Sequence, residues 1–328
     1  MSSSYCSPPL SFFKKLPETP VAILSPIARK EMNGSMHSNK RRRGFLCLCL
    51  IPATVLFFVF MILPTFTVFR LSLFKAANKY DPNGVDKFIG LNNFKALFTN
   101  ATFIQALQNT ILIIVVVTII TFFFAIVFAA ILTREKLKGQ NFFRVIFYIP
   151  NILSMSVIAG IFSAIYEPES GLLDSFLAFF KGEPVMHPWK FELAIVSLIV
   201  AMVWQAIGYY MVMYMSSMSA VSLSLYESAG LDGAGRIKQF FQITLPLIWT
   251  NLRTTLTFFI ISTINMAFLF IRAFWGTNPN QTTALNYMYT QATRDRGYSM
   301  AAGVVVFLFS FVLSALVNKV TKRDVLEV

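Results

Sequence analysis

The stretch "YESAGLDGAGRIKQFFQITLP", Tyr226–Pro246, is a mostly polar interruption in a very apolar chain. It follows the apolar run 193–215 and precedes the run 247–272. Two interpretations are open. The stretch is a loop that lies on the bilayer surface, or it is a short helix presented to a soluble partner, with Glu227 as a charged contact.

The internal pattern of this stretch predicts a helix, a tight turn and a second helix. Gly233 allows a sharp change of direction because glycine tolerates a positive φ. After it, apolar residues recur at the spacing of one helix face: Ile237, Phe240, Phe241 and Leu245. Pro246 has no N–H and suits the first turn of a following helix, the expected membrane span.

The composition is that of an integral membrane protein. Of 328 residues, 56% are hydrophobic and 13% charged, whereas soluble chains carry roughly 25% charge. A helical span needs about 20 apolar residues, and continuous rather than alternating runs favour helices over a barrel. We expect an all-α polytopic fold with six spans, at about 45–70, 107–132, 143–166, 193–215, 247–272 and 300–318.

Basic residues predict that both termini are cytoplasmic. "NKRRRG" precedes the first span, "TREKLKGQ" follows the second and "NKVTKRDVLEV" ends the chain, whereas the loop between the third and fourth spans is acidic. The basic segment 75–95 opposes this orientation, and the tail cluster outweighs it. Residues 1–44 are expected to be a disordered basic tail, 45–320 the six-helix transmembrane domain and 321–328 a short cytoplasmic tail.

Several functional classes are disfavoured by what the sequence lacks. The net charge of +13 is explained by topology, so no nucleic-acid partner is expected. Three cysteines and two histidines provide no metal cluster, and without a Gly-Lys dipeptide there is no phosphate-binding loop. An ion-coupled secondary transporter, the main alternative, usually needs buried carboxylates, but all fifteen acidic residues lie outside the expected spans or at their edges. Nor does any buried carboxylate pair or nucleophile–base pair indicate an enzyme.

The stretch resembles the E-A-A-x3-G-x9-I-x-L-P pattern of permease subunits in binding-protein-dependent ABC importers. The matching residues are Glu227, Ser228, Ala229, Gly233, Ile243, Leu245 and Pro246, with Ser228 where the family has Ala. "DGAGRIKQFFQITLPL" resembles the carbohydrate branch, as do segments 88–98, 107–116, 142–154 and 282–292. The resemblance covers about residues 45–320.

This resemblance implies a type I importer permease in a bacterial cytoplasmic membrane, non-catalytic and without a cofactor of its own. The loop 222–246 would be a coupling helix on a cytoplasmic ATPase dimer that binds ATP and Mg. The residues implied in this contact are those of the motif together with Asp232 and Ala234. The implied partners are a second permease, most often a different chain, an extracytoplasmic solute-binding protein, membrane lipid and a sugar or oligosaccharide.

Polar residues within the expected spans could line a solute path. They are Asn151, Ser154, Trp204, Gln205, Tyr209, Tyr210 and Asn265. Sugars need hydrogen-bonding groups and an aromatic face, and these residues offer both. Ordinary interhelical packing is the competing interpretation for each of them. The particular sugar stays open, as does a non-sugar solute such as glycerol phosphate.

Overall fold

The computed structural model describes residues 45–75, 86–134, 139–168, 170–184, 186–187, 189, 193–274 and 282–322. The expected tail 1–44 and most of the expected tail 321–328 lie outside the described residues. The chain divides into two units, Met1–Thr65 and Phe66–Val328. From Phe45 onward the first unit is helical and contains a π-helical turn, η1 (Phe58–Ile62). Helix α2 (Leu63–Leu71) begins in this unit and ends in the second.

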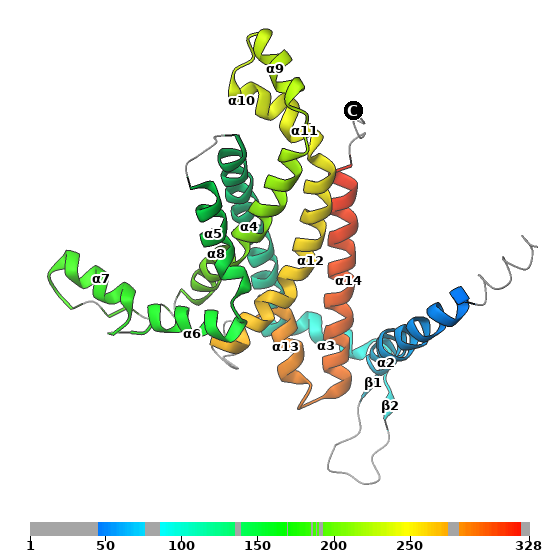
Figure 1. The fold of residues 1–328 in the computed structure, drawn as a ribbon. Helices are drawn as coiled ribbons and strands as arrows, with labels where there is room; N and C mark the ends of the chain where they lie inside the picture. The colour runs from blue at the N-terminus through cyan, green and yellow to red at the C-terminus, as the bar shows by residue number, and fades with distance from the viewer. Residues whose placement is uncertain are drawn as a thin grey trace, which may run out of the picture. The chain divides into compact units, whose positions relative to one another are not determined.

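The second unit is a helical bundle (Figure 1). Its long helices are α4 (Ala101–Arg134), α8 (Ala194–Ser219), α12 (Trp249–Phe274) and α14 (Arg296–Val320). Shorter helices are α3 (Asn92–Thr99), α5 (Gln140–Ile152), α6 (Met155–Ile165), α7 (Leu172–Lys181) and α13 (Ala284–Gln291). Between α8 and α12 lie α9 (Leu223–Leu231), α10 (Arg236–Gln239), η2 (Phe240–Thr244) and α11 (Leu245–Leu247).

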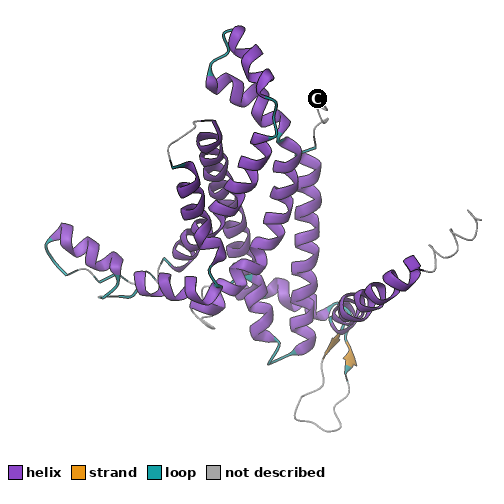
Figure 2. Cartoon of the chain, viewed as in Figure 1, coloured by secondary structure: helices purple, strands orange, loops and turns teal. Residues whose placement is uncertain are grey.

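One short β-ladder departs from the all-α expectation (Figure 2). Strand β1 (Phe74–Lys75) pairs antiparallel with β2 (Lys87–Phe88), with Phe74 opposite Phe88. The side-chain amide of Asn93 on α3 ties β1 down by donating to the carbonyl oxygens of Ser72 (2.9 Å) and Phe74 (3.1 Å). The rest of the described chain is helix, turn or loop, and the predicted helical membrane fold is confirmed.

Five described helices are long and apolar enough to cross a membrane, and the pair α5 and α6 brings the number to six if it is one broken span. The five are Phe45–Leu71, Ala101–Thr133, Ala194–Ser219, Trp249–Phe274 and Arg296–Val320. These match the predicted runs except that the second begins six residues earlier than expected. The predicted third span, 143–166, consists of two helices, α5 and α6, that meet at an angle of 98°.

The local sequence accounts for this break. Pro150, buried near the end of α5, has no N–H to continue the helical hydrogen bonds. Leu153 then adopts an extended conformation, φ −66° and ψ 143°. Ser154 restarts the chain as the N-cap of α6, since its hydroxyl accepts a hydrogen bond from the backbone N–H of Val157 (3.4 Å). The break lies at Leu153 and Ser154, three to four residues after Pro150.

The core of the second unit lies where α8 packs against α4, α5 and α12. Phe122 on α4 makes ring contacts with Tyr210, Tyr214 and Phe259 from the other helices, with centroids 5.2–5.8 Å apart. Tyr214 is fully buried, and its hydroxyl is paired with that of Thr255 on α12 (2.8 Å). Because this polar pair is satisfied, it fixes α8 against α12 without leaving a donor unpaired in an apolar interior.

A glycine sets the approach of α5 to α8. A Cβ added at the buried Gly208 would overlap the backbone carbonyl of Phe147 on α5. Glycine therefore lets these two helix backbones come closer than any side chain would allow, as small residues do at interfaces between membrane helices. The sequence analysis did not identify this residue.

Candidate functional site

The 222–246 loop forms a helix, a tight turn and a second helix at one end of the bundle (Figure 1), and this part of the prediction is confirmed. Helix α9 ends in a Schellman turn. The N–H of Gly233 donates to the carbonyl of Gly230 (3.0 Å), and that of Ala234 donates to the carbonyl of Ala229 (2.8 Å). Gly233 has φ +76°, the left-handed conformation that this turn requires and that glycine adopts without strain.

Side-chain hydrogen bonds hold the two halves of the loop together. The Gln239 amide on α10 donates to the carbonyl oxygens of Ala234 (2.9 Å) and Tyr226 (3.4 Å). The Tyr226 hydroxyl is paired with that of Thr244 (2.9 Å), a residue that is 1% exposed. α9 is thus tied both to the turn and to the segment that leads into α12. The sequence analysis missed Tyr226, Gln239 and Thr244, because only long-range pairing distinguishes them from other polar loop residues.

The second half of the loop widens into a π-helical turn before Pro246. The N–H of Leu245 bonds to the carbonyl of Phe240, five residues back. Pro246 cannot donate, and in an α-helix its ring would meet the carbonyl of Gln242, so a wider turn relieves both problems. Pro246 lies in the first turn of α11, a three-residue helix, and not in the first turn of the membrane span α12, which begins at Trp249.

The apolar residues of the second half do not share one face, so that prediction is wrong. Phe240 and Leu245 pack against the core, whereas Ile237 and Phe241 are 76% and 60% exposed. The π-helical turn shifts the angular positions of residues after Phe240 and thereby separates the set. Ile237 and Phe241 line an apolar groove of about 410 Å³ together with Val127, Ala130 and Ile131 of α4. Leu231 on α9 is 91% exposed.

The motif residues divide between the outer surface and the base of the loop. Glu227, Ser228 and Asp232 are exposed. The remaining motif residues other than Gly233 are partly buried, namely Ala229, Ala234, Ile243, Leu245 and Pro246. Behind the loop lies a cavity of about 410 Å³, lined on the loop side by Tyr226 and Gln239 and on the bundle side by the ends of α4 and α8.

Of the expected solute-path residues, four lie on α8 and do not share one environment. Trp204 and Tyr209 are each 39% exposed, and the buried side-chain oxygen of Gln205 has no hydrogen-bond partner among the described residues. Tyr210 instead packs into the core against Phe122 and Phe259. The α8 residues Trp204, Gln205 and Tyr209 remain path candidates, while the contacts of Tyr210 are those of a packing residue.

The other three path candidates come from α5, α6 and α12. Asn151 and Ser154 flank the sharp break between α5 and α6, where the last carbonyl groups of α5 have no partners within the helix. Such polar backbone is tolerated at membrane depth where it faces protein or a water-filled cavity. Asn265 is exposed on α12.

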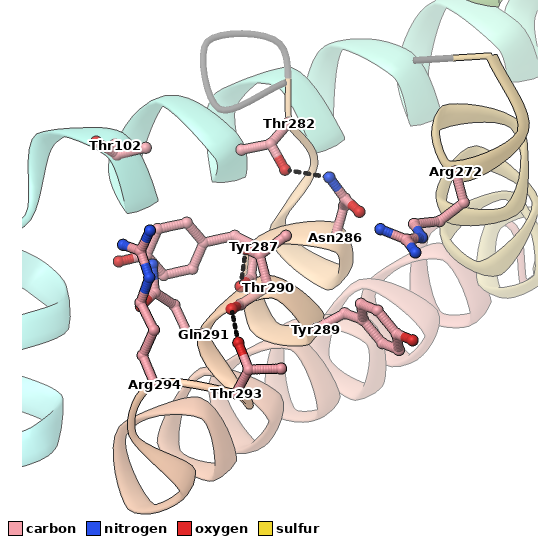
Figure 3. A pocket seen from close by; sticks show the side chains of 10 residues that line it. All are labelled: Thr102, Arg272, Thr282, Asn286, Tyr287, Tyr289, Thr290, Gln291, Thr293 and Arg294. Carbon is pink, nitrogen blue, oxygen red and sulfur yellow. Dashed lines mark hydrogen bonds between the residues drawn. The ribbon is translucent and has the colours of Figure 1, made fainter. Parts of the chain in front are cut away.

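A polar pocket of about 480 Å³ lies at the other end of the bundle, between α12, α13 and the start of α4 (Figure 3). It is lined by Thr102, Arg272, Thr282, Asn286, Tyr287, Tyr289, Thr290, Gln291, Thr293 and Arg294. The sequence analysis assigned no site here. Among the described residues, no group of three or more His, Cys, Asp and Glu side chains could hold a metal ion.

Comparison with known proteins identifies the family of this chain. Residues 122–323, which include the 222–246 loop, match the family described as the binding-protein-dependent transport system inner membrane component. The chain belongs to this family. It is therefore a permease component of an inner membrane transport system and not a soluble protein.

Relatives of this permease cover nearly its whole length. It is 34% identical over 286 residues to a probable ABC transporter permease protein, YurN, of Bacillus subtilis, covering 84% of this chain and 95% of that protein. It is 26% identical over 310 residues to the polygalacturonan/rhamnogalacturonan transport system permease protein YteP of the same species, covering 92% and 95%.

A solved structure shows the same fold. It is a bacterial alginate ABC transporter in complex with an alginate pentasaccharide-bound periplasmic protein. The TM-score is 0.74 at 21% identity, over 88% of this chain and 99% of that one. At this identity the likeness concerns the fold alone.

Proposed function

We propose that this permease is one of two membrane subunits of an ATP-driven carbohydrate importer and that its 222–246 loop is the coupling helix. The observation that carries the proposal is the construction of the loop. Helix α9 stands at the end of the bundle, closed by the Schellman turn and tied down by Gln239 and Tyr226. A rigid element with an exposed apolar side chain, Leu231, and an exposed carboxylate, Glu227, suits a groove on a soluble partner.

The loop can transmit movement because both of its ends continue into membrane helices. α8 ends at Ser219, only a few residues before α9 begins at Leu223. On the other side, α10, η2 and α11 run to within one residue of α12. A displacement of α9 by a closing ATPase dimer would be passed to both helices, and alternating access needs such a two-state lever rather than a catalytic group.

The roles of the motif residues follow from their positions. Glu227, exposed on α9, would contact a basic side chain of the ATPase. Gly233 permits the turn, while Leu245 and Pro246 brace it on α12. ATP and Mg would be bound by the ATPase and not by this chain. A separate second permease and an extracytoplasmic solute-binding protein would complete the importer, with the loop on the cytoplasmic side.

A carbohydrate is the proposed substrate class. The motif and its neighbours resemble the carbohydrate branch, and one of the relatives is a polygalacturonan/rhamnogalacturonan permease. The path candidates on α8 add aromatic surface and the amide oxygen of Gln205, which has no partner among the described residues. Both suit a ligand rich in hydroxyl groups. A non-sugar solute such as glycerol phosphate is the alternative within the same mechanism.

The test is purification of the tagged chain from its host membranes in mild detergent, with mass spectrometry of the proteins retained. We expect an ATPase with a phosphate-binding loop, a second permease and a solute-binding protein. Glu227→Gln should reduce retention of the ATPase, whereas Glu183→Gln, at an exposed position after α7, should not. A chain that purifies alone and transports without ATP would overturn the proposal in favour of ion coupling.

A further inference from the structure

The polar pocket lined by α12 and α13 lies far from the coupling loop. Because a helix rises 1.5 Å per residue, Arg272 is about 35 Å along α12 from Trp249, which starts the helix beside the loop. The volume of about 480 Å³ is in the range of small-ligand sites. The pocket therefore has no part in the ATPase contact proposed above.

The described lining of the pocket carries positive charge without a carboxylate to balance it. Arg272 and Arg294 line it, and no Asp or Glu is among its described lining residues. The segment 275–281, WGTNPNQ, contains no acidic residue either. Among the described residues the only partner of Arg272 is the ring of Tyr289, 4.7 Å from the guanidinium carbon. Stacking occupies the face of the guanidinium and leaves its N–H edges available to an anion.

A buried acceptor faces the same space. Asn286 is 1% exposed, and its Nδ2 donates to the hydroxyl of Thr282 (2.9 Å). Its Oδ1 is buried and has no hydrogen-bond partner among the described residues. Figure 3 shows this amide pointing toward Arg272. An unpaired buried carbonyl oxygen is costly unless a donor reaches it.

We propose that this pocket binds an anionic polyhydroxylated group, such as a sugar acid or a polyol phosphate. The acid group would lie on the N–H edge of Arg272, with Arg294 adding positive charge, and a ligand hydroxyl would donate to Oδ1 of Asn286. A carboxylate side chain of a partner protein would satisfy Arg272 but would supply no donor to Asn286. This inference rests on the proposed importer function and narrows the substrate to anionic carbohydrates or related polyols.

The experiment measures equilibrium binding to the purified full-length permease with its co-purified subunits. The probes are digalacturonate, glycerol 3-phosphate and neutral maltose. We expect one of the two anions to bind and maltose not to bind, and the better anion identifies the acid group as carboxylate or phosphate. Losing a charged hydrogen bond should weaken binding about ten- to hundredfold in Arg272→Gln. Arg296→Gln, which removes a nearby arginine that does not line the pocket, is the matched control.

Asn286→Leu tests the hydroxyl contact and also serves if Arg272→Gln does not fold. It should weaken anion binding by about two- to tenfold, the effect of one neutral hydrogen bond. The inference is overturned if neither anion binds, if maltose binds equally well, or if both pocket variants behave like Arg296→Gln. It is also overturned if Arg272→Gln affects only retention of the solute-binding protein, because the occupant would then be a protein side chain. If no anion binds but the ATPase is retained normally, the anion site is refuted and the proposed importer function stands. If the ATPase is lost but an anion still binds, only the proposed importer function is refuted.

Discussion

Gly233 provides the sharpest test of the coupling loop, because its importance rests on backbone conformation alone. Its φ is +76°, and a Cβ added there would meet nothing within 4 Å. A side chain would therefore cause no clash, and its cost is that of forcing an L-residue into the left-handed region, about 1–2 kcal/mol. Such a cost lowers the population of the native turn by about 5- to 30-fold relative to opened forms.

The same loop supplies a matched control. Gly235 also has nothing within 4 Å of an added Cβ, but its φ is −66° and it is the N-cap of α10. Serine fits that conformation and is a favoured N-cap residue. The substitutions Gly233→Ser and Gly235→Ser thus introduce the same side chain into equally open space and differ in backbone strain.

The assay is the ratio of co-purified ATPase to permease, measured over a dilution series in detergent, with membrane insertion followed separately. We expect Gly233→Ser to weaken association of the ATPase with the permease by up to about 5- to 30-fold. The apparent affinity falls with the fraction of permease molecules in which the native turn is formed. Gly235→Ser should behave as the wild type. Gly233→Asn should recover much of the loss, because Asn visits the left-handed region more readily. Equal retention by the two serine variants would refute the conformational argument.

Three further predictions concern the loop and the bundle. Gln239→Leu removes the hydrogen bonds to Ala234 and Tyr226, and amide exchange in the turn at Gly233 should accelerate about 2- to 10-fold. Gln242→Leu, which changes an exposed glutamine in η2, should not accelerate it. Leu231→Ser, at a side chain that is exposed in the permease, should weaken ATPase retention about tenfold or more, since burial of a leucine contributes about 1.5–3 kcal/mol. Unchanged retention would mean that the partner does not cover this side chain. Gly208→Ala should force α5 away from α8 and destabilise the permease by about 1–3 kcal/mol, which lowers the unfolding temperature in detergent. Gly160→Ala, with open space around the added Cβ, should leave the unfolding temperature unchanged.

The sequence was most informative where the physical signal is local. Hydropathy locates α8, α12 and α14 to within a few residues, because each must satisfy its own backbone in an apolar medium. The turn at Gly233 was also predictable, since a positive φ between two helical patterns favours glycine strongly.

The features that the sequence does not predict are the angles between helices and the contacts between residues that are far apart in the sequence. Hydropathy averages over the window around Pro150, so it does not distinguish a straight span from two helices at 98°. The π-helical turn at Phe240–Thr244 rotates the residues that follow it around the helix axis, and the spacing of apolar residues in the sequence does not predict this rotation. Tyr226 and Thr244 pair across eighteen residues, and the α12–α13 pocket joins residues from three separate segments.

Helix α12 connects the two proposed sites physically. One of its ends follows the coupling loop, and the other carries Arg272 at the polar pocket. Between them Thr255 is tied to Tyr214 on α8, and Phe259 is fully packed against Phe122. A packed helix of this kind moves as a body rather than bending, so a ligand on Arg272 and an ATPase on α9 would bias the position of the same element. Such coupling is reciprocal for binding. If an anion favours one position of α12, it changes the affinity for the ATPase by a certain factor, and the ATPase changes the affinity for the anion by the same factor. A factor of one in both titrations would show that the two sites are independent and would refute the coupling through α12.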